Sequence, residues 1–171
     1  MQIFIILSEA WRYPYPGQLE GLQAAAAQLP DQPGKKSLSA FLEQLAGLTF
    51  GEREELYTRS FDLSPLMAPY VGFHLWGESY QRGNFMASLN RALQTANVDL
   101  GGELPDHLSP ILRYLGEAAL PLPDLTDALP RALQSMQRTL QKADPHHPYL
   151  GLLEAVQQAC EAQFDSLRRR S

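Results

Sequence analysis

The chain has 171 residues, a formal net charge of −5 and a hydrophobic content of 44%. This length allows one compact domain whose core needs neither a disulfide nor a metal for its stability. The single cysteine excludes an internal disulfide framework and a cysteine-rich zinc module. The acidic balance disfavours nucleic acid as a partner.

Leu, Ala and Gln are frequent and the β-branched residues are few, a composition that favours helix over strand. Proline and glycine divide the chain into segments of ordinary helical length. We therefore predict one compact, all-α, multi-helix domain over residues 1–171. The predicted helices cover about 2–12, 18–29, 37–46, 49–61, 66–96, 105–119, 126–142 and 148–169.

The first predicted helix has apolar residues at helical spacing, Phe4, Leu7 and Trp11. Its apolar run is short, no basic region precedes it, and Glu9 and Arg12 soon follow. These features predict an amphipathic core helix rather than a signal sequence or a membrane span. No other segment is long and apolar enough to cross a membrane, so we expect a soluble, cytoplasmic protein without direct membrane insertion.

Two predicted helices have recognisable start signals. Ser37 or Ser39 is expected to cap the helix that ends near residue 46. Thr49 and Glu52 have the spacing of a capping box, and the helix that they open is expected to end before the turn at 62–65.

Prolines mark three later helix starts. Pro105 suits a first helical position, where its missing N–H costs nothing, and Asp106 would then lie in the first turn, where a negative charge is favourable. Pro130 and Pro148 lie near the predicted starts of the last two helices.

The longest predicted segment, 66–96, contains Gly77 and Gly83, so we expect either a kink or two helices joined end to end. If the helix continues through Gly77, four polar or aromatic side chains spaced four residues apart share one stripe. They are Tyr70, His74, Glu78 and Arg82. The stripe is interpreted either as a solvated face with one ordinary ion pair or as one wall of a groove for a partner peptide.

His74 and Glu78 would also suit two positions of a metal site if they lie on one helical face. Further ligands, such as His107 with Asp106 or the pair 146–147, could come only from tertiary contacts. No HExxH or di-iron Glu-x-x-His pair occurs in the sequence. We therefore expect no metal and interpret 146–147, between two prolines, as an exposed loop. A small metal-dependent helical enzyme remains an alternative.

Cys160 lies at helical spacing from Val156 and Phe164, which predicts a buried and unactivated thiol. No GxSxG motif or phosphate-binding glycine loop accompanies it. The sequence therefore contains no catalytic constellation, and we expect neither enzymatic activity nor a cofactor.

Negative charge is concentrated in the middle of the chain. Residues 52–106 contain eight acidic side chains against four arginines, a net charge of −4. Such a region could be only a solubilising surface, or it could attract a basic peptide by long-range steering. We expect a hollow rimmed by these carboxylates.

Three segments resemble, in order and spacing, the NarJ-type chaperones, which are the nitrate reductase delta-subunit assembly proteins of the TorD/DmsD superfamily. The first reads Glu-Glu-Leu-Tyr-Thr-Arg-Ser-Phe-Asp at 54–62, the second His-Leu-Trp-Gly-Glu-Ser-Tyr-Gln-Arg-Gly at 74–83, and the third Glu-Leu-Pro-Asp-His-Leu at 103–108. Looser likeness extends from the apolar first helix to His-Pro-Tyr at 147–149.

The resemblance implies a compact all-helical fold of the TorD/NarJ type without catalytic activity. Similar proteins bind the catalytic subunit of a molybdopterin enzyme, usually at its N-terminal segment, and assist cofactor insertion before membrane docking or export. A basic N-terminal client peptide would complement the acidic region. By this resemblance the partner is a molybdoenzyme catalytic subunit.

Most candidate client-binding positions are carried over from the matching segments, and Tyr70 is added from the stripe. They are Tyr57, Asp62, Tyr70, His74, Glu78, Arg82, Glu103 and Asp106. Asp62 could instead only organise the turn that follows it, and Asp106 could be only a first-turn helix charge. Phe61 is expected in the core.

The sequence departs from the family pattern at Tyr80, where a second arginine is frequent, and at Pro110, which stands one residue later than usual. These departures leave three alternatives for the identity of the client: nitrate reductase, a related dehydrogenase or another molybdoenzyme. A generic helical adapter would share the same fold. The oligomeric state, monomer or weak homodimer, is equally open.

Overall fold

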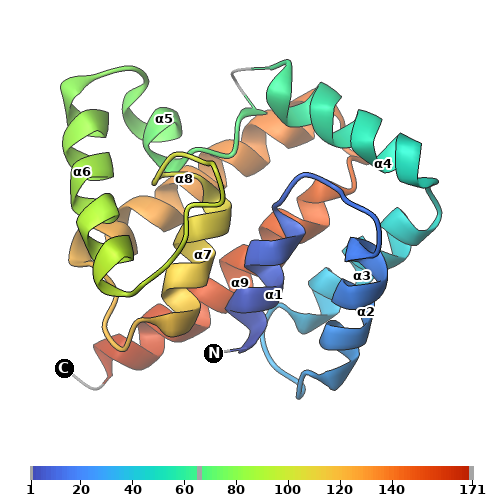
Figure 1. Cartoon of the computed structure of the whole chain (residues 1–171), viewed down its shortest axis with the longest axis horizontal. Helices are drawn as coiled ribbons and strands as arrows, with labels where there is room; N and C mark the ends of the chain where they lie inside the picture. The colour runs from blue at the N-terminus through green and yellow to red at the C-terminus, as the bar shows by residue number, and fades with distance from the viewer. Residues whose placement is uncertain (1, 65–66, 170–171) are drawn as a thin grey trace.

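The computed structural model describes residues 2–64 and 67–169, and Figure 1 shows its helices in chain order. Within these ranges the backbone forms nine α-helices, one π-helical turn and no strand. The all-α prediction is confirmed. The elements are α1 (Gln2–Ala10), α2 (Gln18–Gln28), α3 (Lys35–Ala46), α4 (Phe50–Tyr57), η1 (Thr58–Asp62), α5 (Val71–Trp76), α6 (Tyr80–Thr95), α7 (Leu108–Glu117), α8 (Pro123–Ala143) and α9 (Tyr149–Arg168).

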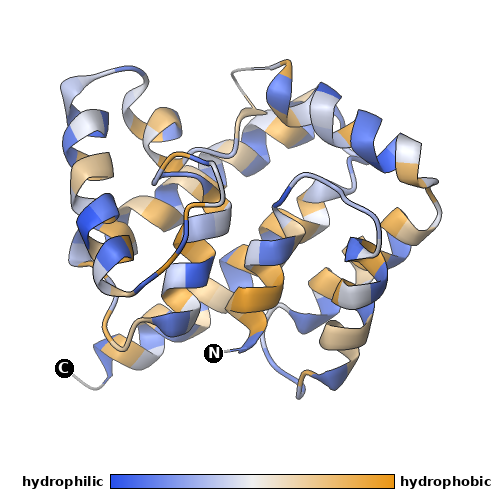
Figure 2. Ribbon diagram, viewed as in Figure 1, coloured by the Kyte–Doolittle hydropathy of each residue, from blue (hydrophilic) through white to orange (hydrophobic). Residues whose placement is uncertain are grey.

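Helix α1 lies in the middle of the molecule, packed against α7 and α9, with α2 and α3 on one side and α5 and α6 on the other (Figure 1). Most of its residues are buried, and much of its ribbon has the colour of hydrophobic residues in Figure 2. Helix α8 packs against both α5 and α9 and buries one side chain every three or four residues, the spacing of a core-facing stripe. The buried residues of α8 are Leu125, Ala128, Leu129, Ala132, Leu133, Met136 and Leu140.

An aromatic cluster joins Trp11, directly after α1, to α3, α9 and η1. Phe61 contacts Tyr149 and Trp11 with ring centroids 4.7 and 5.5 Å apart, and Tyr149 contacts Phe41 at 5.0 Å. Edge-to-face pairs of this kind stabilise by about 0.5–1.5 kcal/mol beyond their area burial. The predicted core position of Phe61, 6% exposed, is confirmed.

Two helix starts show where local sequence signals succeed and fail. The Thr49–Glu52 capping box is confirmed, with N–H to side-chain distances of 3.3 and 2.7 Å. The predicted serine cap of α3 is wrong, because the helix begins at Lys35 after Gly34, which has φ +90°. A Cβ atom at Gly34 would lie 2.6 Å from the carbonyl oxygen of Ala155, so close packing against α9 requires glycine there.

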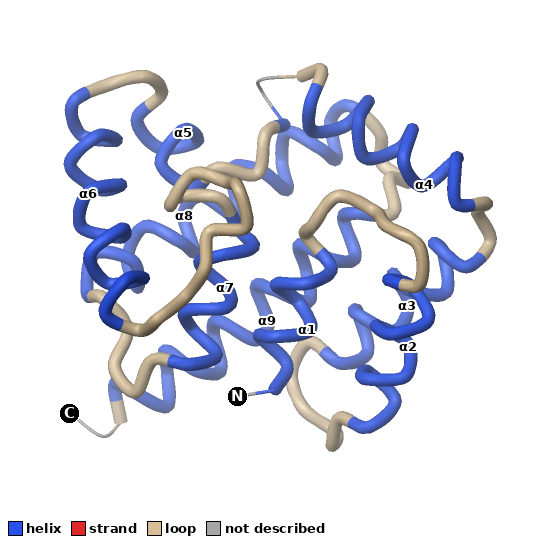
Figure 3. The backbone as a smooth tube through the Cα atoms, in the orientation of Figure 1, coloured by secondary structure: helices blue, strands red, loops and turns tan. Residues whose placement is uncertain are grey.

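The predicted segment 66–96 is two helices, and the long connections beside them are visible in Figure 3. Gly77, with φ +58° and ψ −151°, ends α5, whereas Gly83 lies inside α6 and interrupts nothing. Pro65 and Leu66, in the predicted turn and helix start, lie outside the described residues.

Of the three later starts marked by prolines, the one at Pro148 is confirmed, because Pro148 directly precedes α9, and the other two were predicted wrongly. Helix α7 begins at Leu108 rather than Pro105, and α8 begins at Pro123, which leaves Pro130 in its interior. Among the described residues, no helix has the length and apolar character needed to span a membrane.

Candidate functional site

Arg82 and Asp106 form a buried ion pair that joins α6 to the segment before α7. The Asp106 carboxylate accepts from Arg82 Nε at 2.9 Å and Nη2 at 3.3 Å, and from the Gly72 backbone N–H at 3.2 Å. The carboxylate is fully buried and the Arg82 side chain is 6% exposed. Asp106 is therefore a structural anchor rather than the predicted first-turn helix charge, and neither group of this pair faces solvent.

The predicted stripe is divided by Gly77. Glu78 lies in the connection after α5, with its side chain 80% exposed, and it accepts from Arg82 Nη1 at 2.6 Å. His74 Nε2 bonds instead to the carbonyl oxygen of Ala68 at 2.8 Å, and burial lowers the His74 pKa. The four side chains therefore do not form one continuous wall.

The metal alternative has no geometric support in the described residues. His74 and Glu78 already bond to Ala68 and Arg82, and they lie on opposite sides of the break at Gly77. No group of three or more His, Cys, Asp or Glu side chains is placed to hold a metal ion in residues 2–64 and 67–169.

Tyr57 belongs to the core rather than to an accessible site. It is 4% exposed, donates its hydroxyl to the Trp11 carbonyl at 3.1 Å, and packs against Phe61 at 5.1 Å. Burial raises its pKa far above the ordinary range, and the charges of Glu103 and Asp62 act in the same direction.

A hollow of about 430 Å³ opens between the C-terminal end of α1 and the chain that leads from α6 into α7. We call it the acidic groove. Its lining consists of Ser8, Glu9, Arg12, Tyr13, Asn97, Asp99, Leu100, Gly101, Glu103, His107, Ser109, Pro110, Arg113 and Glu117. Of the eight predicted site residues, only Glu103 lines it.

Four carboxylates and two arginines line the acidic groove. Arg12 pairs with Glu9 at 3.4 Å, and Arg113 pairs with Glu117 at 2.9 Å. Asp99 and Glu103 have no cationic partner among the described residues. Asp99 accepts only from the Gly101 N–H at 2.9 Å, and Glu103 accepts from the Tyr70 hydroxyl at 2.8 Å. The groove thus has two carboxylates available to an incoming cation.

Tyr70 connects the groove to the buried ion pair. Its ring lies 5.7 Å from the Arg82 guanidinium carbon, while its hydroxyl bonds to Glu103. Burial and this bond raise the Tyr70 pKa, so the phenol stays protonated. Asp62 lies at the surface. Partial burial raises the pKa of its carboxyl group, and the negative charge of Glu103 adds to the rise. Tyr70, Glu103 and Asp62 thus form one electrostatically linked group.

His107 lies at the inner side of the groove. It is 2% exposed, its ring is 5.2 Å from that of Tyr70, and its Nδ1 accepts from the Ser109 N–H at 3.0 Å, which caps α7. Burial lowers its pKa, so the imidazole is held neutral. The sequence predicted His107 only as an alternative metal ligand. Asp99 was counted among the acidic residues of 52–106 that were expected to rim a hollow, but it was not named as a binding position, because a polar residue before Gly101 is also typical of a turn.

Exposed apolar side chains lie beside the acidic residues. Tyr13, in the groove lining, is 46% exposed, and Leu104, next to Glu103, is 48% exposed. Leu63, next to Asp62, is 74% exposed. The surface therefore combines negative charge with apolar contact area, both of which a partner chain can use.

Ser60 and His147 resemble a nucleophile–base pair but are not one. His147 Nδ1 accepts from the Tyr149 N–H at 3.2 Å, so Nε2 carries the proton and donates it to Ser60 Oγ at 2.7 Å. A base must accept from its nucleophile, and this one donates. His147 is 8% exposed, so its predicted place in an exposed loop is wrong, whereas its neighbour His146 is exposed.

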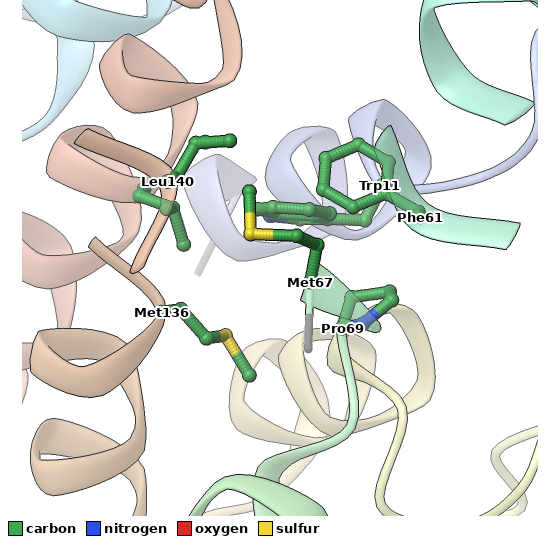
Figure 4. Close-up of a pocket in the computed structure, with 7 residues that line it drawn as sticks. Trp11, Phe61, Met67, Pro69, Met136 and Leu140 are labelled. Carbon is green, nitrogen blue, oxygen red and sulfur yellow. The ribbon is translucent and has the colours of Figure 1, made fainter. Parts of the chain in front are cut away.

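A second hollow, beside Trp11, is apolar and small. Figure 4 shows the side chains of Met67 and Met136 converging on it together with Phe61 and Leu140. Its volume of about 10 Å³ is room for about one water molecule at most. It is too small and too apolar to be a binding or catalytic site.

Cys160 was predicted to be a buried, unactivated thiol. Its exposure of 1% agrees with this prediction, and burial raises the pKa of its thiol.

An all-helical domain with unpaired carboxylates and exposed apolar side chains around one groove has the features of a protein that binds a partner chain. Residues 24–151 match the family model described as nitrate reductase delta subunit. The chain therefore belongs to this family of nitrate reductase assembly chaperones, and the resemblance noted in the sequence is confirmed. No curated protein sequence matches the chain.

Proposed function

We propose that this protein is a cytoplasmic, non-catalytic chaperone that holds the N-terminal segment of a nitrate reductase catalytic subunit in the acidic groove. It would keep that subunit competent for insertion of the molybdenum cofactor before membrane docking or export. The observation that carries the proposal is the pair Asp99 and Glu103, two carboxylates in one groove without a cation of their own among the described residues.

Charge and apolar area would act together in binding. A basic client residue would pair with Asp99 or Glu103, and an apolar neighbour would cover Tyr13 or Leu104. Hydrogen bonds to charged groups contribute about 1.5–3 kcal/mol when water is excluded. A client segment that is disordered beforehand loses entropy on ordering, which keeps the affinity moderate and permits release.

The predicted site residues take two roles in this proposal. Glu103, Tyr70 and Asp62 belong to the binding group, because they are at least partly exposed and linked to one another. Arg82 and Asp106 act through them, by holding the backbone around Tyr70. The backbone segments 69–71 and 106–108 are joined by two hydrogen bonds, from Val71 N–H to Asp106 O at 2.8 Å and from Leu108 N–H to Pro69 O at 2.9 Å.

The experiment is a titration of the purified chain with a fluorescent peptide that copies the N-terminus of the nitrate reductase catalytic subunit. The variant Asp99→Asn/Glu103→Gln keeps the shapes of both side chains and removes their charges. We expect it to weaken binding at least tenfold, with unchanged thermal unfolding. The matched control is Glu161→Gln, an exposed acid on α9 that does not line the groove.

Equal affinity of the double variant and the natural chain would contradict the groove as the binding site. No binding by the natural chain, together with normal nitrate reductase maturation in a deletion strain, would contradict the chaperone role itself. A generic adapter would instead co-purify with proteins other than a molybdoenzyme.

A further inference from the structure

A separate hollow of about 380 Å³ lies between α6 and the start of α8, and it shares no lining residue with the acidic groove. We call it the α6–α8 hollow. Its lining consists of Trp76, Gln81, Asn84, Phe85, Ser88, Pro123, Asp124, Asp127 and Ala128. None of these residues is basic, so the only charges in the lining are two negative ones.

Two aromatic rings form the apolar part of this hollow. Trp76 and Phe85 pack with ring centroids 5.1 Å apart and tilted by 59°. Phe85 is buried, whereas Trp76 is only half-buried, so the indole keeps part of its surface open to the hollow. A partly accessible tryptophan ring beside carboxylates is an arrangement that attracts a cation to an aromatic face.

The walls provide polar and aromatic contacts. On α6, Asn84 and Ser88 are four residues apart and line the hollow, and Tyr80, four residues before Asn84, lies on the same helical face and is 92% exposed. On α8, Asp124 has no cationic partner among the described residues, and Asp127 pairs at 3.4 Å with Arg131, with its own side chain 80% exposed.

We propose that the α6–α8 hollow is a docking site for an arginine-bearing segment of a protein partner. A guanidinium can stack on the Trp76 ring and at the same time donate to Asp124 or Asp127, because its planar group presents several N–H donors around an apolar face. Lysine has a compact, strongly hydrated charge and fits this combination less well. The exposed Tyr80 ring would cover an apolar residue next to the arginine.

The test uses the full chain and a synthetic probe, the amidated and acetylated peptide Leu-Arg-Ala-Leu-Arg-Leu. The chain has two tryptophans, and Trp11 is 1% exposed in the core, so its indole signal serves as an internal reference for that of Trp76. In ¹⁵N-resolved NMR titrations we expect the Trp76 indole signal to move with added peptide while the Trp11 signal stays. The matched peptide has citrulline, the neutral analogue, in place of both arginines and should produce no saturable shift.

Variants test whether Asp124 and Asp127 contribute to binding of the peptide probe. Asp124→Asn/Asp127→Asn should lower the affinity for the probe about fourfold, since each exposed ion pair contributes roughly twofold. Asp165→Asn is the matched control, because Asp165 has a comparable exposed pair with Arg168 at 3.4 Å and lies outside the hollow. The groove variant Asp99→Asn/Glu103→Gln should leave the Trp76 response unchanged, which separates this site from the client groove.

Three results would overturn the proposal: an unmoved Trp76 signal, an equal shift with the citrulline peptide, or equal affinity of the Asp124→Asn/Asp127→Asn variant. A shift of the Trp76 signal that depends on protein concentration without peptide would assign the hollow to self-association instead.

Discussion

The carboxylates of this protein fall into two regions that the sequence does not distinguish. Asp106 is completely buried and saturated by Arg82 and the Gly72 N–H, whereas Asp99 and Glu103 lie in an open groove and neither is paired with a cationic side chain among the described residues. The difference lies in their partners, not in their residue type. A saturated buried carboxylate stabilises the fold, and an open, unpaired one is free to bind a partner.

The largest difference between the two regions is expected for Asp106→Asn, which should destabilise the protein by about 3–5 kcal/mol. The substitution leaves the Arg82 charge buried with a weaker partner, and uncompensated buried charges have costs of this size. Urea unfolding followed by circular dichroism measures the change. Asp99→Asn, at the open carboxylate, is the control and should change stability by less than about 0.5 kcal/mol. Similar losses in both variants would show that the two regions are equivalent.

The close approach at Gly72 gives the next largest effect. A Cβ atom there would lie 2.9 Å from both Asp106 Oδ2 and Arg82 Cγ, so Gly72→Ala must push the ion pair apart. We expect a loss of about 1–3 kcal/mol, the usual cost of overpacking. Gly83→Ala is the matched control, because a Cβ atom at this position in α6 would have no neighbour within 4 Å. There the better helix former should stabilise the protein by up to about 1 kcal/mol.

Sequence reasoning recovered features whose partners lie close in the chain. The Thr49–Glu52 capping box joins residues three positions apart, and the fold class follows from composition and helical spacing. The Arg82–Asp106 pair joins residues 24 apart and depends on how α6 packs, so no local pattern revealed it. Asp99 was counted in the acidic middle of the chain but was not named as a binding position for the same reason, since only the tertiary fold places it opposite α1.

Acid should destabilise the fold through buried histidines such as His147. Burial lowers the His147 pKa below its ordinary value near 6.5, so at pH values under about 6.5 the unfolded chain binds more protons than the folded one. Stability is therefore fully present above pH 6.5 and is lost as the pH falls toward the lower pKa of the folded state. His147→Asn should reduce the loss of stability between pH 7.5 and 5.5, because the side-chain oxygen of Asn can accept from the Tyr149 N–H without titrating.

His146→Asn is the control for this pH dependence, since His146 is exposed on the same turn. Unfolding by urea at the two pH values provides the measurement. Equal pH slopes for the His147→Asn variant and the natural chain would show that the buried imidazole is not the group that titrates.

The smallest effect is expected at Glu78, which contacts the buried Arg82 from the solvent side. Its carboxylate touches the buried Arg82 at 2.6 Å, yet its side chain is 80% exposed, so water already solvates most of it. Glu78→Gln should therefore lower stability by only about 0.2–1 kcal/mol, like other exposed ion pairs, and the loss should shrink in about 1 M salt. Because Asp106 keeps Arg82 in place, client binding should stay within about twofold of the natural chain. A tenfold weaker client affinity in Glu78→Gln would instead extend the binding surface from Glu103 to the connection after α5.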